Sequence, residues 1–352
     1  MRTFFKKIIF KIFNNLFLII INKRPLDLES VSDILILFQK PLGIGDLIML
    51  SPLVLLLEET FKKHNIYIVT EYEKFIFFKK TVWIHPKALN KAVTKENSIV
   101  ISPMLTFSHL KYILKSKYFI GYFFSNKLVS NFMKNDYIYS LKNEHYLKKI
   151  YPILDAFNIR YNKDHFSYPK IISIDKVSDS NHIVIAPYVN WDERQFPQSK
   201  FVLLINFLLE VSSCKIILIG SDSPVEVEFN KQIEVMISSP RIDNQTGLTT
   251  LLGMNSLINN AKLFIGNDSG PSHIAYLTAR KSLILFGSVR FEDRVPLSSK
   301  LTKNISCIDN RASCDYFPCY DGLSKPNCIN KNKYSCVSNA EISNNLIIEL
   351  LN

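Results

Sequence analysis

The residues that could do chemistry gather in one stretch, residues 266–273, with the sequence GNDSGPSH. An apolar run, residues 263–265, precedes this turn, and Pro271 can open a helix after it, since proline is favoured at the first helical position. A second apolar run at 282–286 completes a strand–helix–strand unit. In open α/β sheets, ligands bind at the carboxyl ends of such strands. The unpaired N–H groups and positive dipole of the helix start suit a phosphate.

Side chains in the same turn add to this anion site. Ser269 and Ser272 bring hydroxyl donors, and His273 stands in the first turn of the expected helix. The alternative is that Asp268 or Ser269 only caps the helix, because both residue types are preferred caps.

A second glycine turn lies near the start of the chain. The apolar run 34–38 predicts a buried strand, and Gly43, Gly45 and Asp46 lead from it into an apolar helix. Pro52 is expected to kink that helix or restart it, with Ser51 as the new cap. Neither a dinucleotide fingerprint nor a phosphate-loop Gly-Lys-Ser/Thr is present. Asp46 could cap the helix or serve as a base that faces a neutral hydroxyl.

Strands and helices alternate along most of the chain, which predicts an α/β protein with doubly wound, mostly parallel sheets. We expect a first unit at 33–165, a polar connection around 160–181, a second unit at 181–338 and a last helix at 339–352. The aromatic stretch 122–150 and His145 are candidates to line a cleft, with core packing as the alternative.

The first 24 residues combine apolar side chains on one predicted helix face with Lys and Asn on the other. Their uncharged run is too short to span a bilayer, and no small-residue cleavage site follows. We expect residues 1–32 to form an amphipathic segment on a membrane surface, followed by a linker. Packing of this helix on the protein's own core is the alternative.

The overall composition narrows the class of partner. A net charge of +12 favours an anionic partner such as a phosphorylated substrate or an anionic membrane. No nucleic-acid-binding motif accompanies the charge, so we expect no nucleic acid. The chain has six cysteines, five of them at 307–336, without a Cys-x-x-Cys pair. Reduced structural thiols are therefore expected rather than a metal site or disulfides.

Three motifs together resemble glycosyltransferase family 9, the ADP-heptose:lipopolysaccharide heptosyltransferases and their relatives. The first is the strand at 34–38 with Gly43, Gly45 and Asp46, and the second is the sequence RQFP at 194–197. The third runs from the TGL at 246–248 through GNDSGPSH to the LFG at 285–287. The resemblance covers about residues 33–345. It implies the GT-B architecture, in which two Rossmann-like domains face each other across a cleft.

The resemblance also implies roles at matching positions. Asp46 would be the catalytic base, beside a cleft loop that holds Gly43 and Gly45. Arg194 stands where the family usually has Lys, and Asp222 and Glu226 compete for the nucleoside ribose. The donor-binding residues implied in this way are Arg194, Asp222, Glu226, Asp268, Ser269, Gly270, Pro271, Ser272 and His273.

The reaction implied is an inverting transfer of a sugar, with heptose from ADP-heptose as the leading case. No metal and no obligatory cofactor are expected, and the nucleotide sugar is a co-substrate. The acceptor would be a glycolipid or oligosaccharide such as lipopolysaccharide, met at the inner face of the cytoplasmic membrane by a peripheral cytoplasmic enzyme. Two alternatives are a family member with another donor sugar and a non-catalytic nucleotide-sugar or glycan-binding protein.

Overall fold

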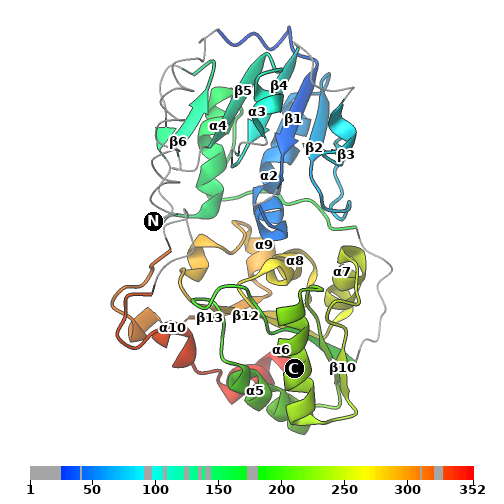
Figure 1. Cartoon of the computed structure of the whole chain (residues 1–352), viewed down its shortest axis with the longest axis vertical. Helices are drawn as coiled ribbons and strands as arrows, with labels where there is room; N and C mark the ends of the chain where they lie inside the picture. The colour runs from blue at the N-terminus through cyan, green and yellow to red at the C-terminus, as the bar shows by residue number, and fades with distance from the viewer. Residues whose placement is uncertain are drawn as a thin grey trace.

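The computed structural model describes residues 25–39, 42–90, 97–104, 106, 109–122, 127–133, 137–138, 144–172, 181–309, 311–320 and 328–352. Two α/β units follow each other along the long axis of the molecule, each built on its own sheet (Figure 1). The amphipathic helix expected near the N-terminus falls at residues 1–24, outside the described residues.

The N-terminal unit holds a seven-stranded sheet in the order β3-β2-β1-β4-β5-β6-β7. Strands β3 to β5 are parallel, whereas β6 and β7 add an antiparallel edge. Three central strands are buried along their whole length, which explains why they read as continuous apolar runs. The strands are β1 (Asp33–Leu37), β2 (Asn65–Val69), β3 (Val82–Ile84), β4 (Ser98–Ser102), β5 (Tyr118–Tyr122), β6 (Lys127–Ser130) and β7 (Tyr137–Ile138). The helices are α2 (Ile44–Thr60), α3 (Leu110–Ile113) and α4 (Tyr151–Ala156), with 3₁₀ turns η1 (Ala88–Asn90) and η3 (Tyr146–Ile150).

Helix α2 corrects the expectation that Pro52 restarts the helix with Ser51 as its cap. The helix runs without interruption from Ile44 to Thr60, with Pro52 inside it. Proline removes the N–H that would donate to the carbonyl of Ile48, four residues earlier. The hydroxyl of the buried Ser51 donates to that same carbonyl at 2.6 Å. The side chain thus replaces the missing backbone bond, and the helix continues.

The C-terminal unit has a fully parallel six-stranded sheet in the order β10-β9-β8-β11-β12-β13. Its strands are β8 (His182–Ala186), β9 (Lys215–Leu218), β10 (Ile242–Asn244), β11 (Leu263–Asn267), β12 (Ser282–Phe286) and β13 (Ile305–Asp309). Its helices are α5 (Gln198–Val211), α6 (Pro224–Ile237), α7 (Leu251–Asn260), α8 (Gly270–Thr278), α9 (Ser299–Thr302), α10 (Ser335–Ser338) and α11 (Asn344–Leu351), with 3₁₀ turns η4 (Phe291–Asp293) and η5 (Arg311–Ser313).

The strand order of both sheets reverses direction at one point, between β1 and β4 and between β8 and β11. Ligands of open α/β sheets bind outside the carboxyl ends of the strands at such a switch point. The loops that follow β1, β8 and β11 carry the glycine turn, the Arg194 loop and the GNDSGPSH turn. The topology therefore delivers all three motifs to the space between the two units.

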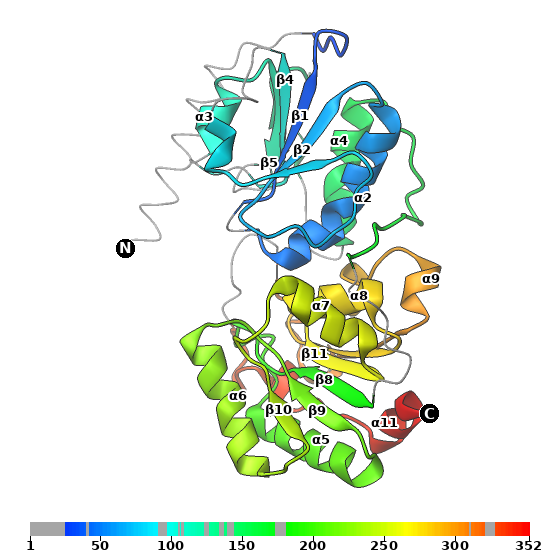
Figure 2. The same ribbon diagram turned by 90° about the vertical axis from the view of Figure 1, so that its right-hand side faces the viewer.

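The two units touch through the N-terminal turns of α2 and α8 (Figure 2). The described part of the connection expected around residues 160–181 contacts both units. Ile171 forms a β-bridge with Ile76 of the first unit, and the N–H of Phe166 donates to the carbonyl of Leu297 in the second at 2.8 Å.

The last helix is shorter than the expected 339–352, because α11 begins only at Asn344. The chain before it is held as a loop, with the carbonyl of Ala340 accepting a hydrogen bond from the ammonium of Lys200 on α5.

Candidate functional site

A cavity of about 520 Å³ lies between the two units and contains the predicted catalytic and anion-binding motifs. Asp46 lines it from the first turn of α2, and Ser269, Gly270 and His273 line it from the start of α8. Asp46 and Gly270, which are 224 positions apart in the sequence, thus line the same cavity. The architecture unites the two sequence motifs that could do chemistry.

Asp46 is fixed at both of its carboxylate oxygens. The backbone N–H of Gly43 donates to Oδ2 at 2.7 Å, and the hydroxyl of Tyr146 donates to Oδ1. The first bond makes Asp46 part of the cap of α2, so one of the two expected roles is present in the structure. The side chain is nevertheless half-buried on the cavity wall, where its remaining lone pairs can accept a proton.

The GNDSGPSH turn does not use its side chains as helix caps. Helix α8 begins at Gly270, one residue before the expected Pro271, and Ser269 is its N-cap residue without a capping side-chain bond. The Ser269 hydroxyl has no partner among the described residues. It is therefore available, together with the backbone at the helix start, to a ligand in the cavity.

Ser272 is not placed in the cavity. Its side chain is fully buried, and its hydroxyl donates to the carbonyl of Asn267 at 2.5 Å. This residue stabilises the turn from β11 into α8, because it is on the face of the helix that packs on the sheet.

Arg194 extends across the cavity from the loop after β8. Its Nη1 lies 3.2 Å from Oδ2 of the buried Asp268. The guanidinium stacks near Trp191, at 4.4 Å from the ring centroid, and near Tyr320, at 5.2 Å. Two aromatic rings and one carboxylate hold the charge in place, which favours planar recognition of phosphate oxygens.

Gly287, at the end of β12, supports the Arg194 loop from behind. A Cβ atom at Gly287 would lie 2.0 Å from the carbonyl oxygen of Glu193 and 2.9 Å from Cα of Arg194. Only glycine allows this approach of loop to strand. The LFG sequence at 285–287 thus fixes the position of the Arg194 loop.

His273 is buried, and desolvation lowers its pKa to about 4, although the carboxylates of Asp268 and Asp46 act in the opposite direction. Its Nε2 lies 3.8 Å from Oδ1 of Asp268. The imidazole is therefore neutral near pH 7. It serves as a hydrogen-bonding group, while Arg194 carries the positive charge on this wall.

A second cavity of about 410 Å³ continues from the donor turn into the C-terminal unit. Tyr188, Asn190, Ser221, Glu226 and Pro271 contribute to its lining, and it shares Asp268–Gly270 with the first cavity. Glu226 packs over Gly220, and burial raises the pKa of its carboxyl while a hydrogen bond from Ser221 opposes that effect. Asp222 is exposed and does not line the cavity. Of the two residues that the resemblance offers for the ribose, only Glu226 lines this cavity.

The first cavity is also lined by Trp191, Arg294 and Tyr320, which the sequence reasoning missed, and by Tyr146 and Lys149 from the stretch 122–150, which it named as a candidate to line a cleft. They come from loops and short turns whose sequences show no periodicity or motif. Burial lowers the pKa of Lys149 to about 8, while the nearby Asp46 raises it. The signal that pointed to Tyr146 and Lys149 was the aromatic and basic composition of residues 122–150.

His145 itself is a structural residue. Its Nδ1 accepts from the N–H of Leu147 as the cap of η3, and its Nε2 lies 2.8 Å from the carbonyl of Val295 in the other unit. Burial lowers its pKa to about 4. The side chain joins the two units and does not line the cavity.

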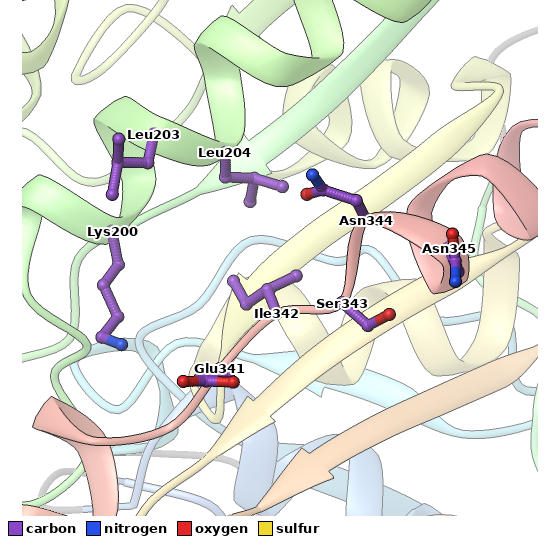
Figure 3. Close-up of a pocket in the computed structure, with 8 residues that line it drawn as sticks. All are labelled: Lys200, Leu203, Leu204, Glu341, Ile342, Ser343, Asn344 and Asn345. Atoms are coloured by element: carbon purple, nitrogen blue, oxygen red, sulfur yellow. The ribbon is translucent and has the colours of Figure 1, made fainter.

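Other features lie away from this site. Figure 3 shows a separate pocket of about 430 Å³ between α5 and the segment before α11, where Lys200 and Glu341 lie among leucine, isoleucine, serine and asparagine side chains. All six cysteines are free thiols. Within the described ranges, no group of three or more His, Cys, Asp or Glu side chains could hold a metal ion. No helix in that part of the chain is long and apolar enough to cross a membrane.

Comparison with known proteins shows which family the chain resembles. The model of glycosyltransferase family 9 (heptosyltransferase) matches residues 147–320, which include the Arg194 loop and the GNDSGPSH turn. This part of the chain is thus similar to glycosyltransferase family 9. Lipopolysaccharide heptosyltransferase 1 of Campylobacter coli is 26% identical over 178 residues, or 47% of this chain. The chain spans 50% of the length of that curated relative.

Solved structures extend the likeness to nearly the whole of this chain. A glycosyltransferase of family 9 from Veillonella parvula superposes with a TM-score of 0.67 at 17% identity, covering 94% of this chain and 99% of that one. Heptosyltransferase II of E. coli gives 0.59 at 14% identity, with 91% and 98% covered. E. coli heptosyltransferase WaaC, solved with ADP-2-deoxy-2-fluoro heptose, gives 0.57 at 13%, with 91% and 99% covered. The GT-B architecture expected from the sequence is confirmed.

Proposed function

We propose that this chain is an inverting glycosyltransferase that moves a heptose from a nucleotide-sugar donor to a hydroxyl of a surface glycan. One observation carries the proposal: Asp46 of the first unit and the Ser269–Gly270 turn of the second line the same cavity. A base and an anion-binding helix start on facing walls are the two groups that displacement of a nucleotide from a sugar requires.

The donor half of the reaction belongs to the C-terminal unit. The leaving nucleoside diphosphate gathers negative charge, which the start of α8 and the Arg194 guanidinium can stabilise. Ser269 and the neutral His273 add hydrogen bonds. Glu226 lines the second cavity, which supports a role for its carboxylate in accepting hydrogen bonds from ribose hydroxyls.

The acceptor half belongs to Asp46. An acceptor hydroxyl in the cavity would lose its proton to this carboxylate as it attacks the anomeric carbon from the face opposite the leaving group. General-base catalysis of this kind is worth about 100- to 10,000-fold in rate. Holding both reactants in one closed space adds a further entropic advantage.

ADP-heptose is the donor that we propose, and lipopolysaccharide is the acceptor. The structure of WaaC with ADP-2-deoxy-2-fluoro heptose and the name of the Campylobacter relative support this choice. The net charge of +12 fits an anionic glycolipid at the inner face of the cytoplasmic membrane, where we propose that the protein acts peripherally.

Asp46→Asn tests the proposal directly, because it removes the base and keeps the shape of the side chain. With ADP-heptose and a heptose-deficient lipopolysaccharide, we expect transfer to fall at least 100-fold while the affinity for ADP stays within about twofold. Asp164→Asn, an exposed position outside the cleft, is the matched control. Near-normal turnover of Asp46→Asn contradicts the assignment, and ADP binding by the wild type without any transfer supports a non-catalytic binding protein.

The donor is tested separately by thermal shift against ADP-, UDP-, GDP- and CMP-sugars. A selective rise in Tm with the ADP-sugar is the expected result, since ligand binding to the folded state stabilises it. A selective response to another nucleotide would replace ADP-heptose as the donor and leave the transfer chemistry in place.

A further inference from the structure

Tyr146 is a side chain that no sequence motif singled out, yet it touches the proposed base. It is the first residue of the 3₁₀ turn η3, one hundred positions after Asp46. The residue is buried, with 5% of its surface exposed. Its hydroxyl donates to Oδ1 of Asp46. The N–H of Gly43 donates to Oδ2, so each carboxylate oxygen of Asp46 accepts one hydrogen bond.

This double hold has a geometric consequence. A carboxylate with one donor on each oxygen cannot rotate about its Cβ–Cγ bond without breaking one of two hydrogen bonds. Each oxygen still keeps a lone pair for a further donor. Since general-base catalysis depends on the placement of the accepting oxygen to within a fraction of an ångström, this restraint bears on the rate.

Tyr146 stays a donor throughout the pH range in which the protein is folded. Burial raises the pKa of its phenol well above 10, and the adjacent Asp46 carboxylate acts in the same direction. The hydroxyl therefore keeps its proton and cannot compete with Asp46 for the role of base.

The ring of Tyr146 is held by cations from both units. The ammonium of Lys149, on η3, lies 5.3 Å from the ring centroid, and the guanidinium carbon of Arg294, in the C-terminal unit, lies 4.9 Å from it. Both distances are in the range of cation–π attraction. The hydroxyl that orients the base thus belongs to a ring that also contacts the donor-binding unit.

The geometry points to Tyr146 as a positioning residue for Asp46, which fixes the base through its hydroxyl while its ring contacts the donor-binding unit. This inference rests on the proposed function, in which Asp46 is the base. Tyr146 contacts no reacting atom in this assignment, because its hydroxyl is directed at Oδ1 of Asp46.

Tyr146→Phe separates positioning from packing, because it removes the hydroxyl and keeps the ring between Lys149 and Arg294. We expect kcat for transfer from ADP-heptose to a heptose-deficient lipopolysaccharide to fall about 10- to 100-fold. KM for the donor and the affinity for ADP should stay within twofold, since the donor wall is untouched.

Tyr122→Phe is the matched control. Tyr122 is also buried, and its ring centroid lies 5.6 Å from the ammonium of Lys149. Its hydroxyl donates to the backbone carbonyl of Lys149 at 2.8 Å. It therefore loses one buried phenol hydrogen bond without touching Asp46. Both variants should lose a similar amount of thermal stability, and only Tyr146→Phe should lose kcat.

The double variant Asp46→Asn/Tyr146→Phe completes the test. It should be no slower than Asp46→Asn alone, because a positioning residue has nothing to contribute once its base is gone. A Tyr146→Phe kcat within twofold of wild type, while Asp46→Asn is inactive, overturns the inference and leaves the proposed function standing. Full activity of Asp46→Asn instead refutes the proposed function itself.

Discussion

Gly45 and His273 meet across the cleft so closely that no side chain fits between them. A Cβ atom on Gly45 would lie 2.4 Å from Cδ2 of His273. One residue belongs to the first turn of α2 and the other to the first turn of α8, so this contact sets how near the two helix starts come.

Gly45→Ala should therefore hold the two units apart. The added methyl group overlaps the buried imidazole of His273 in the other unit, so one of the two must shift. We expect kcat/KM for transfer to fall at least tenfold and the radius of gyration with ADP bound to rise, as measured by small-angle X-ray scattering. Gly253→Ala is the control, since its Cβ would meet only Thr250 and Thr249, at 3.6 and 3.7 Å. Unchanged activity of Gly45→Ala would mean that the units do not need this contact.

Arg194→Met should weaken ADP binding about 100-fold, and Arg194→Lys about tenfold. Lysine keeps the charge but loses the planar fork and most of the stacking on Trp191 and Tyr320. Isothermal titration calorimetry with ADP measures both. Arg241→Lys serves as control, because Arg241 bonds the carbonyls of Ser212 and Leu209, away from the cleft. ADP affinity unaffected in Arg194→Met would exclude a phosphate contact.

Glu226→Gln and Asp222→Asn make the same chemical change at two neighbouring positions. Of the two residues, only Glu226 lines the second cavity. Glu226→Gln should therefore weaken ADP binding about tenfold and Asp222→Asn less than twofold. Inorganic pyrophosphate should bind equally well to both variants, because it lacks the ribose. Equal losses of ADP affinity in the two variants would contradict the choice of Glu226.

Stability should decline as the pH falls from about 6.5 to 4. Burial lowers the pKa of His109, His145 and His273 from 6.5 to about 4 each. In the unfolded chain these histidines become protonated below pH 6.5, whereas in the folded protein they stay neutral until about pH 4. The stabilisation is therefore complete above pH 6.5 and is lost toward pH 4, by something on the order of 1 to 3 kcal/mol per histidine. Urea denaturation at pH 7, 5.5 and 4.5 measures it.

A variant with one titrating group fewer checks the origin of this slope. His109→Asn should lower the slope of unfolding free energy against pH by about a third, whatever it does to stability at pH 7. A urea midpoint that is flat or rises toward pH 4.5 would contradict the account.

Local sequence was sufficient for the features built within one short segment. The unit from Leu263 to Phe286 has strand, turn and helix in contact along the chain, so its anion site follows from composition and spacing. Asp46 is similar, since its capping bond to Gly43 spans three residues. Ser272 was expected to add a hydroxyl to the anion site, but spacing alone does not tell that its side chain is buried and bonds the carbonyl of Asn267.

Features that depend on contacts between distant parts of the chain could not be predicted. Tyr146 meets Asp46 across one hundred residues, and Arg294 meets Tyr146 from the other unit. Neither partner has a recognisable pattern around it. Pro52 shows a third kind of limit, because the rule that proline ends helices holds only when no side chain replaces the lost donor.

The close approach of Gly287 to the Arg194 loop has a thermodynamic consequence. Because the end of β12 already presses on the backbone at Glu193, the loop has little conformational freedom to lose when a nucleotide arrives. The entropic cost of forming the complex then falls mainly on the approach of the two units and on the sugar. Donors that share a diphosphate should accordingly differ little in how fast they dock and more in how long the closed state lasts.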